Sequence, residues 1–221
     1  LYQRLTGAIE PRMPMTGPPF LSDGEIAAVA AWIDAGLPEG EAPPPPQSAQ
    51  TPASEGVRYP DVAAIFLQRC ARCHSEGSVL GAPPEGLILT SRDAILAGGE
   101  RIVLVPGNAT LSPIWRHVAG IETPRMPFDG PPFLGDAEIT LIAAWIDEGA
   151  RDAEGRGAPM PVGGSIRVEG ILTAKGELDG ARFAVLPGAR IEDALRIGGR
   201  YELRGVITED GVLSVQRARA R

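Results

Sequence analysis

The stretch "YPDVAAIFLQRCARCH", residues 59–74, decides how the middle of this chain folds. Its apolar residues follow one helical stripe: Val62, Ile65, Phe66, Leu67 and Cys70. We therefore predict a helix that runs into the cysteine-containing segment at its end. Cys70 and Cys73 are the only cysteines among the 221 residues, so a disulfide framework is excluded as the organising principle.

Cys70, Cys73 and His74 have the Cys-x-x-Cys-His spacing that attaches c-type haem. Residues three and four apart lie on one face of a helix, so both thiols can reach one edge of a haem and form thioethers. The adjacent His74 can then place its imidazole beneath the iron. The motif predicts one covalently bound haem c with His74 as an iron ligand.

Two other uses of these residues are weaker alternatives. A structural zinc site needs four ligands, and the cysteines and histidines of the chain are limited to Cys70, Cys73, His74 and His117. A thioredoxin-like redox pair needs a βαβ context, whereas this motif ends a predicted helix. We favour covalent haem over both.

The second axial position of the iron has four candidates: Met126, His117, Met160 or an open site. Met126 lies between two prolines downstream of the motif, and a stiff extended segment suits a thioether held against iron. A lone methionine more often fills a gap in a core. However, an earlier copy of the same phrase retains a methionine, Met13, whereas it has Arg4 in place of His117. We therefore favour Met126 and keep the other three as alternatives.

That earlier copy belongs to a long internal repeat. Residues 1–37 align with residues 114–150 without a gap and share 19 identities, including "PRMP" at 11–14 and 124–127. Such identity indicates a duplication. Residues 1–37 thus resemble the second half of a unit whose haem-binding half does not precede them in this sequence. Met13 is then a candidate ligand to the iron of a second haem, supplied by a missing half or by a partner chain.

Composition shifts divide the chain into five parts. We predict a partial unit at 1–37, a Pro-rich linker at 38–56, a helical domain at 57–150, a second linker at 151–163 and a β module at 164–221. Within the helical domain, further helices are expected over "TSRDAILAGG" (90–99), "NATLSPIWRHVAG" (108–120) and "GDAEITLIAAWIDEGA" (135–150), each stopped by glycine.

The last part changes to a two-residue period. Strands are predicted over "SIRVEGILTA" (165–174), "ARFAVL" (181–186), "RYELRGVIT" (200–208) and "GVLSVQRA" (211–218), with turns at "KGELDG" and "EDG". The expected fold class is therefore a mainly α protein with a small antiparallel β module, for which an OB-like barrel is one candidate form.

The net charge and the hydropathy of the chain argue against a nucleic-acid-binding protein and against a transmembrane helix. The net charge is −7, and the acidic excess lies in residues 1–156, which argues against nucleic-acid binding. No apolar run reaches eighteen residues, so no transmembrane helix is expected.

These motifs resemble a known family. "CARCHSEG", "GLILTSRDAILAGGERIVLVPGNATLSPIW", "PRMPF" and "EITLIAAWIDEGA" occur in the order seen in class I cytochrome c domains, and look especially like planctomycete-type cytochrome c domains. The resemblance covers about residues 58–150. It implies Cys70 and Cys73 as thioether anchors, with His74 and Met126 as iron ligands. It also implies that Leu87 and Leu89 face the haem.

Together these observations predict an electron carrier, and not an enzyme in its own right. A haem with two protein ligands has no vacant position, so one-electron cycling between Fe(II) and Fe(III) remains, within a multi-haem chain or a redox complex and with redox proteins as partners. The alternatives are a peroxidase-like or gas-reactive haem enzyme from which Met126 dissociates, or a docking subunit of a larger oxidoreductase. The family implies a periplasmic, extracellular or membrane-facing location, because covalent haem attachment takes place outside the cytoplasm.

Overall fold

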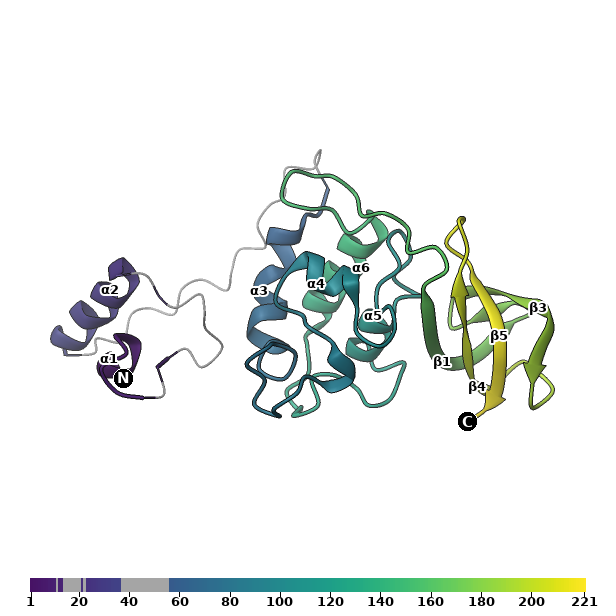
Figure 1. Cartoon of the computed structure of the whole chain (residues 1–221), viewed down its shortest axis with the longest axis horizontal. Coiled ribbons are helices and arrows are strands. Elements are labelled where there is room, and N and C mark those ends of the chain that lie inside the picture. The colour runs from purple at the N-terminus through teal and green to yellow at the C-terminus, as the bar shows by residue number, and fades with distance from the viewer. Residues whose placement is uncertain (11, 14–20, 22, 37–55) are drawn as a thin grey trace.

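The computed structural model describes residues 1–10, 12–13, 21, 23–36 and 56–221. Figure 1 shows two N-terminal helices, a helical unit in the middle and a β-barrel at the C-terminal end. The N-terminal helices are α1 (Tyr2–Leu5) and α2 (Asp23–Asp34). The linker predicted at 38–56 lies outside the described residues, except for its last position, and so does residue 37.

The helical unit consists of short helices joined by long loops. They are α3 (Tyr59–Arg69), a 3-10 turn η1 (Pro84–Gly86), α4 (Arg92–Ala97), α5 (Pro113–Val118) and α6 (Asp136–Asp147). Glycines end two of them with left-handed backbone, at Gly98 (φ 70°) and Gly120 (φ 76°). The predictions of helices before these glycines and of the helix within 135–150 are confirmed.

The core of the helical unit forms where α3 packs against α6. Trp145 of α6 is fully buried, and its ring centroid lies 5.8 Å from that of Phe66 and 5.8 Å from that of Tyr59, both on α3. The Trp145 indole Nε1 donates a hydrogen bond to the carbonyl of Arg151 at 3.0 Å. Aromatic packing of this kind fixes the helix that carries the cysteine motif against the last helix of the unit.

The C-terminal module is a closed barrel of five strands. They are β1 (Ser165–Ala174), β2 (Glu177–Leu178), β3 (Ala181–Ile191), β4 (Arg200–Ile207) and β5 (Leu213–Ala220), in the spatial order β1-β2-β3-β5-β4. Four of the contacts between neighbouring strands are antiparallel, whereas β3 and β5 pair in parallel, with Phe183 opposite Leu213.

The expected mainly α fold class is wrong. Helices make up only 28% of the described structure, and the barrel is a second full module. The helices stay short because the chain contains 28 glycines and 22 prolines, which interrupt helical backbone. The expectation of an antiparallel module also fails, because the parallel β3–β5 pair closes the barrel.

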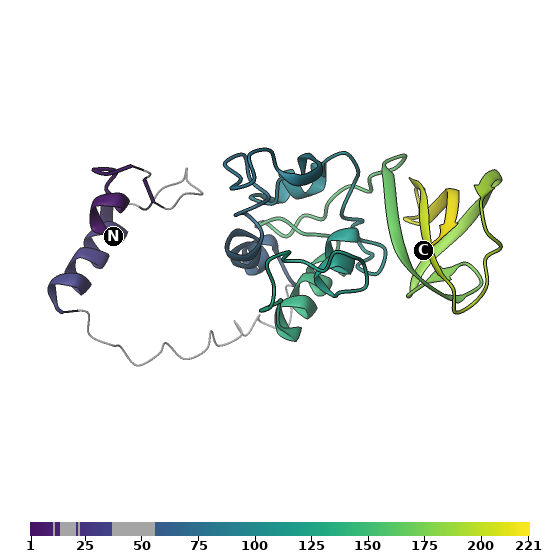
Figure 2. The same cartoon turned by 90° about the horizontal axis from the view of Figure 1, so that it is seen from below.

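The barrel and the helical unit share a boundary core. Figures 1 and 2 show the barrel beside the helical unit, with β1 following directly from it. Val105 and Leu111, from the loop before α5, are fully buried in the barrel's own hydrophobic cluster. The backbone amide of Ile102 donates to the carbonyl of Ser165 on β1 at 3.0 Å. The segment 151–163, predicted as a linker, also bonds to the helical unit, since Ala158 N donates to Gly149 O at 2.8 Å.

One face of the barrel carries a dense charge network around Glu202 of β4. The Glu202 side chain is 1% exposed and accepts hydrogen bonds from Arg204 at 2.7 Å and Arg219 at 3.0 Å, with Arg221 as a further partner. Burial alone would raise the pKa of Glu202, but the hydrogen bonds from Arg219 and Arg204 outweigh it and hold the pKa at about 2.

Candidate haem site

The cysteine motif forms a turn that continues α3. Cys70 N donates to Phe66 O at 2.9 Å, and both Cys73 N and His74 N donate to Cys70 O, at 3.1 and 2.9 Å. Both thiols are free of disulfide bonds and partly buried. Burial raises the pKa of Cys70 to about 12, so its thiol is protonated at neutral pH and unsuited to thiolate redox chemistry.

The orientation of His74 is fixed by the segment after the motif. Its Nδ1 lies 3.2 Å from the Leu87 carbonyl, and Leu89 N donates to His74 O at 2.8 Å. A carbonyl can only accept, so Nδ1 carries the hydrogen and the lone pair is left on Nε2. A metal-binding imidazole is held in this way.

The surroundings of His74 favour its neutral form, which is the form that binds a metal. Burial lowers the pKa of His74, the hydrogen bond to Leu87 partly opposes this, and the nearby His117 lowers the pKa further. Leu89 is 4% exposed, and Leu87 packs against the same core cluster. Both leucines therefore lie beside the histidine, in apolar surroundings that keep water away.

The loop carrying Met126 is fastened to α5 through His117. Met126 N donates to His117 O at 3.0 Å, and His117 Nδ1 donates to the Pro124 carbonyl at 2.8 Å. The Met126 side chain is partly buried and packs against the cluster that also holds Cys70 and Leu89.

Two contacts join the cysteine motif to the Met126 loop. Arg72, inside the motif, forms an ion pair with Asp129 at 3.3 Å. Arg69, the last residue of α3, donates to the Pro132 carbonyl at 2.8 Å. The structure thus brings the segment of the two cysteines and His74 next to the segment of Met126.

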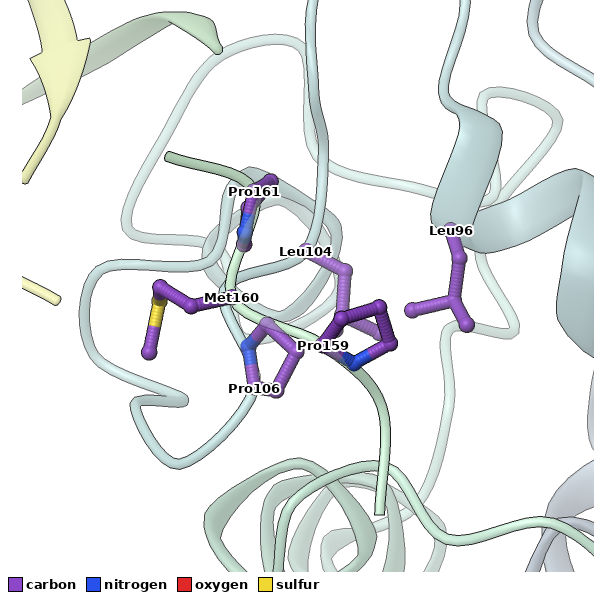
Figure 3. A pocket seen from close by; sticks show the side chains of 6 residues that line it. All are labelled: Leu96, Leu104, Pro106, Pro159, Met160 and Pro161. Atoms are coloured by element: carbon purple, nitrogen blue, oxygen red, sulfur yellow. The ribbon is translucent and has the colours of Figure 1, made fainter. Parts of the chain in front are cut away.

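The two other protein ligands considered for the iron are placed differently. Both ring nitrogens of His117 face other groups, the Pro124 carbonyl and the Glu122 carboxylate, with Nε2 3.6 Å from Glu122 Oε2. Met160 packs against the barrel cluster and not the cluster of Met126. Figure 3 shows Met160 in a small apolar pocket of about 120 Å³, among the labelled residues Leu96, Leu104, Pro106, Pro159 and Pro161.

The residues beside Met126 fit a haem in one further respect. The Trp115 indole Nε1 on α5 is buried, yet it has no hydrogen-bond partner among the residues that the structure describes. Trp115 packs against the same cluster as Met126 and Leu87. A buried donor without an acceptor is costly, and a haem propionate would supply an acceptor. Two thiols, an imidazole with a free Nε2, a thioether and this indole are a donor set suited to haem c. Zinc is a poorer fit, because nowhere in the described ranges do three His, Cys, Asp or Glu side chains gather around a common point.

Comparison with known proteins agrees with this geometry. Residues 70–130 match the family of planctomycete cytochrome c. This match agrees with the resemblance predicted from the sequence and, over the matched segment, suggests a cytochrome c-like haem protein. The matched segment contains both cysteines, His74 and Met126, but not residues 1–37, so the second partial copy stays a prediction.

No curated protein and no solved structure matches the chain. Cytochrome c domains are typically secreted or periplasmic. In the part of the chain that the structure describes, no helix is long and apolar enough to cross a membrane.

Sequence reasoning missed a buried ion pair next to this site. Arg116 on α5 is 0% exposed and donates to the Glu122 carboxylate at 2.7 Å, to Thr110 O at 2.6 Å and to Glu169 O at 3.0 Å. Glu122, 1% exposed, also accepts from Glu169 N of β1 at 2.9 Å. Glu122 therefore lies between the barrel and His117, whose carbonyl accepts from Met126 N. A single arginine in a short helix gives no sequence signal for this arrangement.

Proposed function

We propose that this chain transfers single electrons through a haem c attached to Cys70 and Cys73, with His74 and Met126 as axial ligands. The main support for this proposal is that the cysteine motif and the Met126 loop lie in contact. The cysteine motif and the Met126 loop contact each other through Arg72 and Asp129, and both pack on one apolar cluster. When bound, a haem with histidine and methionine ligands supplies a one-electron Fe(II)/Fe(III) couple of raised potential.

The protein's own residues account for the remaining requirements. The Leu87 carbonyl holds the His74 ring with Nε2 free, and His117 holds the Met126 loop through two hydrogen bonds. Leu89 and the surrounding cluster exclude water. With two protein ligands held in place, little has to move when the charge at the iron changes, which suits electron transfer better than binding of a substrate at the iron.

Exposed apolar side chains follow each of the two joined segments along the chain. Three large apolar side chains there are exposed: Val79 at 47%, Leu80 at 62% and Phe128 at 78%. Val79 and Leu80 follow the cysteine motif, and Phe128 follows Met126. Exposed apolar groups of this size favour transient protein docking. We propose that a redox protein docks here, outside the cytoplasm, in a redox complex or multi-haem chain.

Spectroscopy of the haem-loaded chain tests the ligand set. We expect a ferric methionine-to-iron charge-transfer band at neutral pH, and we expect Met126→Ala to abolish it. Met160→Ala is the matched control, because Met160 packs on the barrel cluster, and it should leave the band unchanged. Absence of the band in the unmodified chain would refute the closed ligand set and favour the enzyme alternative. A band that survives Met126→Ala in the isolated chain would refute the assignment of Met126.

A further inference from the structure

The N-terminal segment repeats the local backbone of the Met126 region. Met13 N donates to Arg4 O at 2.8 Å, just as Met126 N donates to His117 O at 3.0 Å, 113 positions later. Gly7 has a left-handed φ of 78°, as Gly120 has at 76°. Among the described residues, the Met13–Arg4 hydrogen bond and the backbone of Gly7 therefore repeat those of Met126, His117 and Gly120.

The helix after Met13 matches α6 in extent but not in burial. The bounds of α2, Asp23–Asp34, are those of α6 shifted by 113 positions. Trp145 of α6 is 0% exposed, whereas its counterpart on α2, Trp32, is 47% exposed. Val29 and Ile33 of α2 are likewise only partly buried, whereas their counterparts on α6, Ile142 and Ile146, are buried.

In the helical unit that contains α6, another helix covers the face that is exposed on α2. On α6 the equivalent face packs against α3, through Phe66 and Tyr59. The cysteine motif begins at the residue that follows α3. An apolar helix face that is covered in one copy and exposed in the other indicates that its partner helix lies elsewhere.

We propose that α1, α2 and Met13 form the distal half of a second haem c unit. A partner polypeptide segment completes it by packing a helix that ends in Cys-x-x-Cys-His onto Val29, Trp32 and Ile33. Met13 then serves as an axial ligand to the haem on that helix. Within these 221 residues the only two cysteines lie at the end of α3, which already packs on α6, so the covering helix lies outside these residues.

This proposal goes beyond electron transfer at the first site and is tested separately from it. The experiment uses the native assembly isolated through a tag on this chain from the cells that make it. Covalent haem is counted per chain as the pyridine haemochrome against amino-acid analysis, and the ferric methionine-to-iron band is recorded. We expect at least two haems per chain and a band with contributions from two sites.

Three variants separate the outcomes. Met13→Ala should reduce the band by about half while the haem count stays constant, because the ligand is lost but the covering helix remains. Trp32→Glu should lower both the band and the haem count, because it places a charge in the helix contact. Met160→Ala is the control and should change neither.

The results that overturn the proposal are equally distinct. One haem per chain, with a band unchanged by Met13→Ala, shows that no second haem uses this methionine. A partner that Trp32→Glu releases without any change in the haem count shows that the helix face binds a polypeptide without haem, such as a second copy of the chain. Complete loss of the band in Met126→Ala would support Met126 as the ligand of the first site and refute only the second site.

Discussion

Removal of the Arg116 side chain should destabilise the protein far more than removal of an exposed arginine. In Arg116→Leu, the Glu122 carboxylate loses its arginine and stays buried, with its bond from Glu169 N and with His117 Nε2 3.6 Å away. The Thr110 and Glu169 carbonyls lose their hydrogen-bond donor as well. The change therefore affects α5 and β1 at the same time.

The expected magnitude follows from the burial of both partners. Loss of one member of a buried ion pair costs about 3–5 kcal/mol, which is a large part of a typical total stability of about 5–15 kcal/mol. For a folded part of this size, that corresponds to a fall in Tm of about 6–20 °C. The control Arg72→Leu breaks an ion pair whose partners are 68% and 66% exposed. It should cost only about 0–1 kcal/mol.

The assay is urea unfolding of the haem-loaded chain, followed by far-UV circular dichroism and by the haem absorption band. We also include Arg116→Leu combined with Glu122→Gln, which removes the buried charge while its side-chain oxygen can still accept from Glu169 N. This double variant should be more stable than Arg116→Leu alone. If Arg116→Leu loses no more stability than Arg72→Leu, the buried pair does not hold the barrel to the helical unit and the reasoning fails.

Three further predictions concern the ligand, the barrel and the docking surface. Met126→Ala should lower the reduction potential in voltammetry, whereas Met160→Ala should not; equal effects would contradict the ligand assignment. Because the pKa of Glu202 falls from 4.5 to about 2 on folding, its contribution to stability is present above pH 4.5 and lost as the pH falls toward about 2. Urea unfolding across this range should therefore show a shallower acid dependence for Glu202→Gln, and an unchanged slope would count against the network. Phe128→Ser should slow electron exchange with the redox partner in stopped-flow measurements and leave the potential unchanged; an unaltered rate would place docking elsewhere.

The sequence predicted local features of this structure well. The spacing of Cys70, Cys73 and His74 predicted a haem attachment motif, and the family match covers that segment. Helix ends were predictable where glycine adopts left-handed backbone, as at Gly98. The strand at 165–174 has the predicted bounds because its apolar residues follow the strand period and fill the barrel.

Features that depend on distant partners were not predictable. The turn expected at 175–180 contains β2, whose two residues pair with β1 and β3 to close the barrel. The parallel pairing of β3 with β5 leaves no trace in either strand's period. Arg116 reads as a surface charge in a short helix, and only the Glu122 carboxylate and the β1 carbonyl explain its burial.

These same distant contacts bear on the proposed electron transfer. A carrier works best when its iron ligands hold still, and the Met126 loop is a long segment without regular secondary structure. The loop is held to the cysteine motif through Asp129 and to α5 through His117. Behind His117 lies Glu122, which Arg116 and the first barrel strand hold in place. The barrel thus supports the Met126 loop through Glu122 and His117, and the proposed electron transfer would benefit from this support because it helps to hold the loop still.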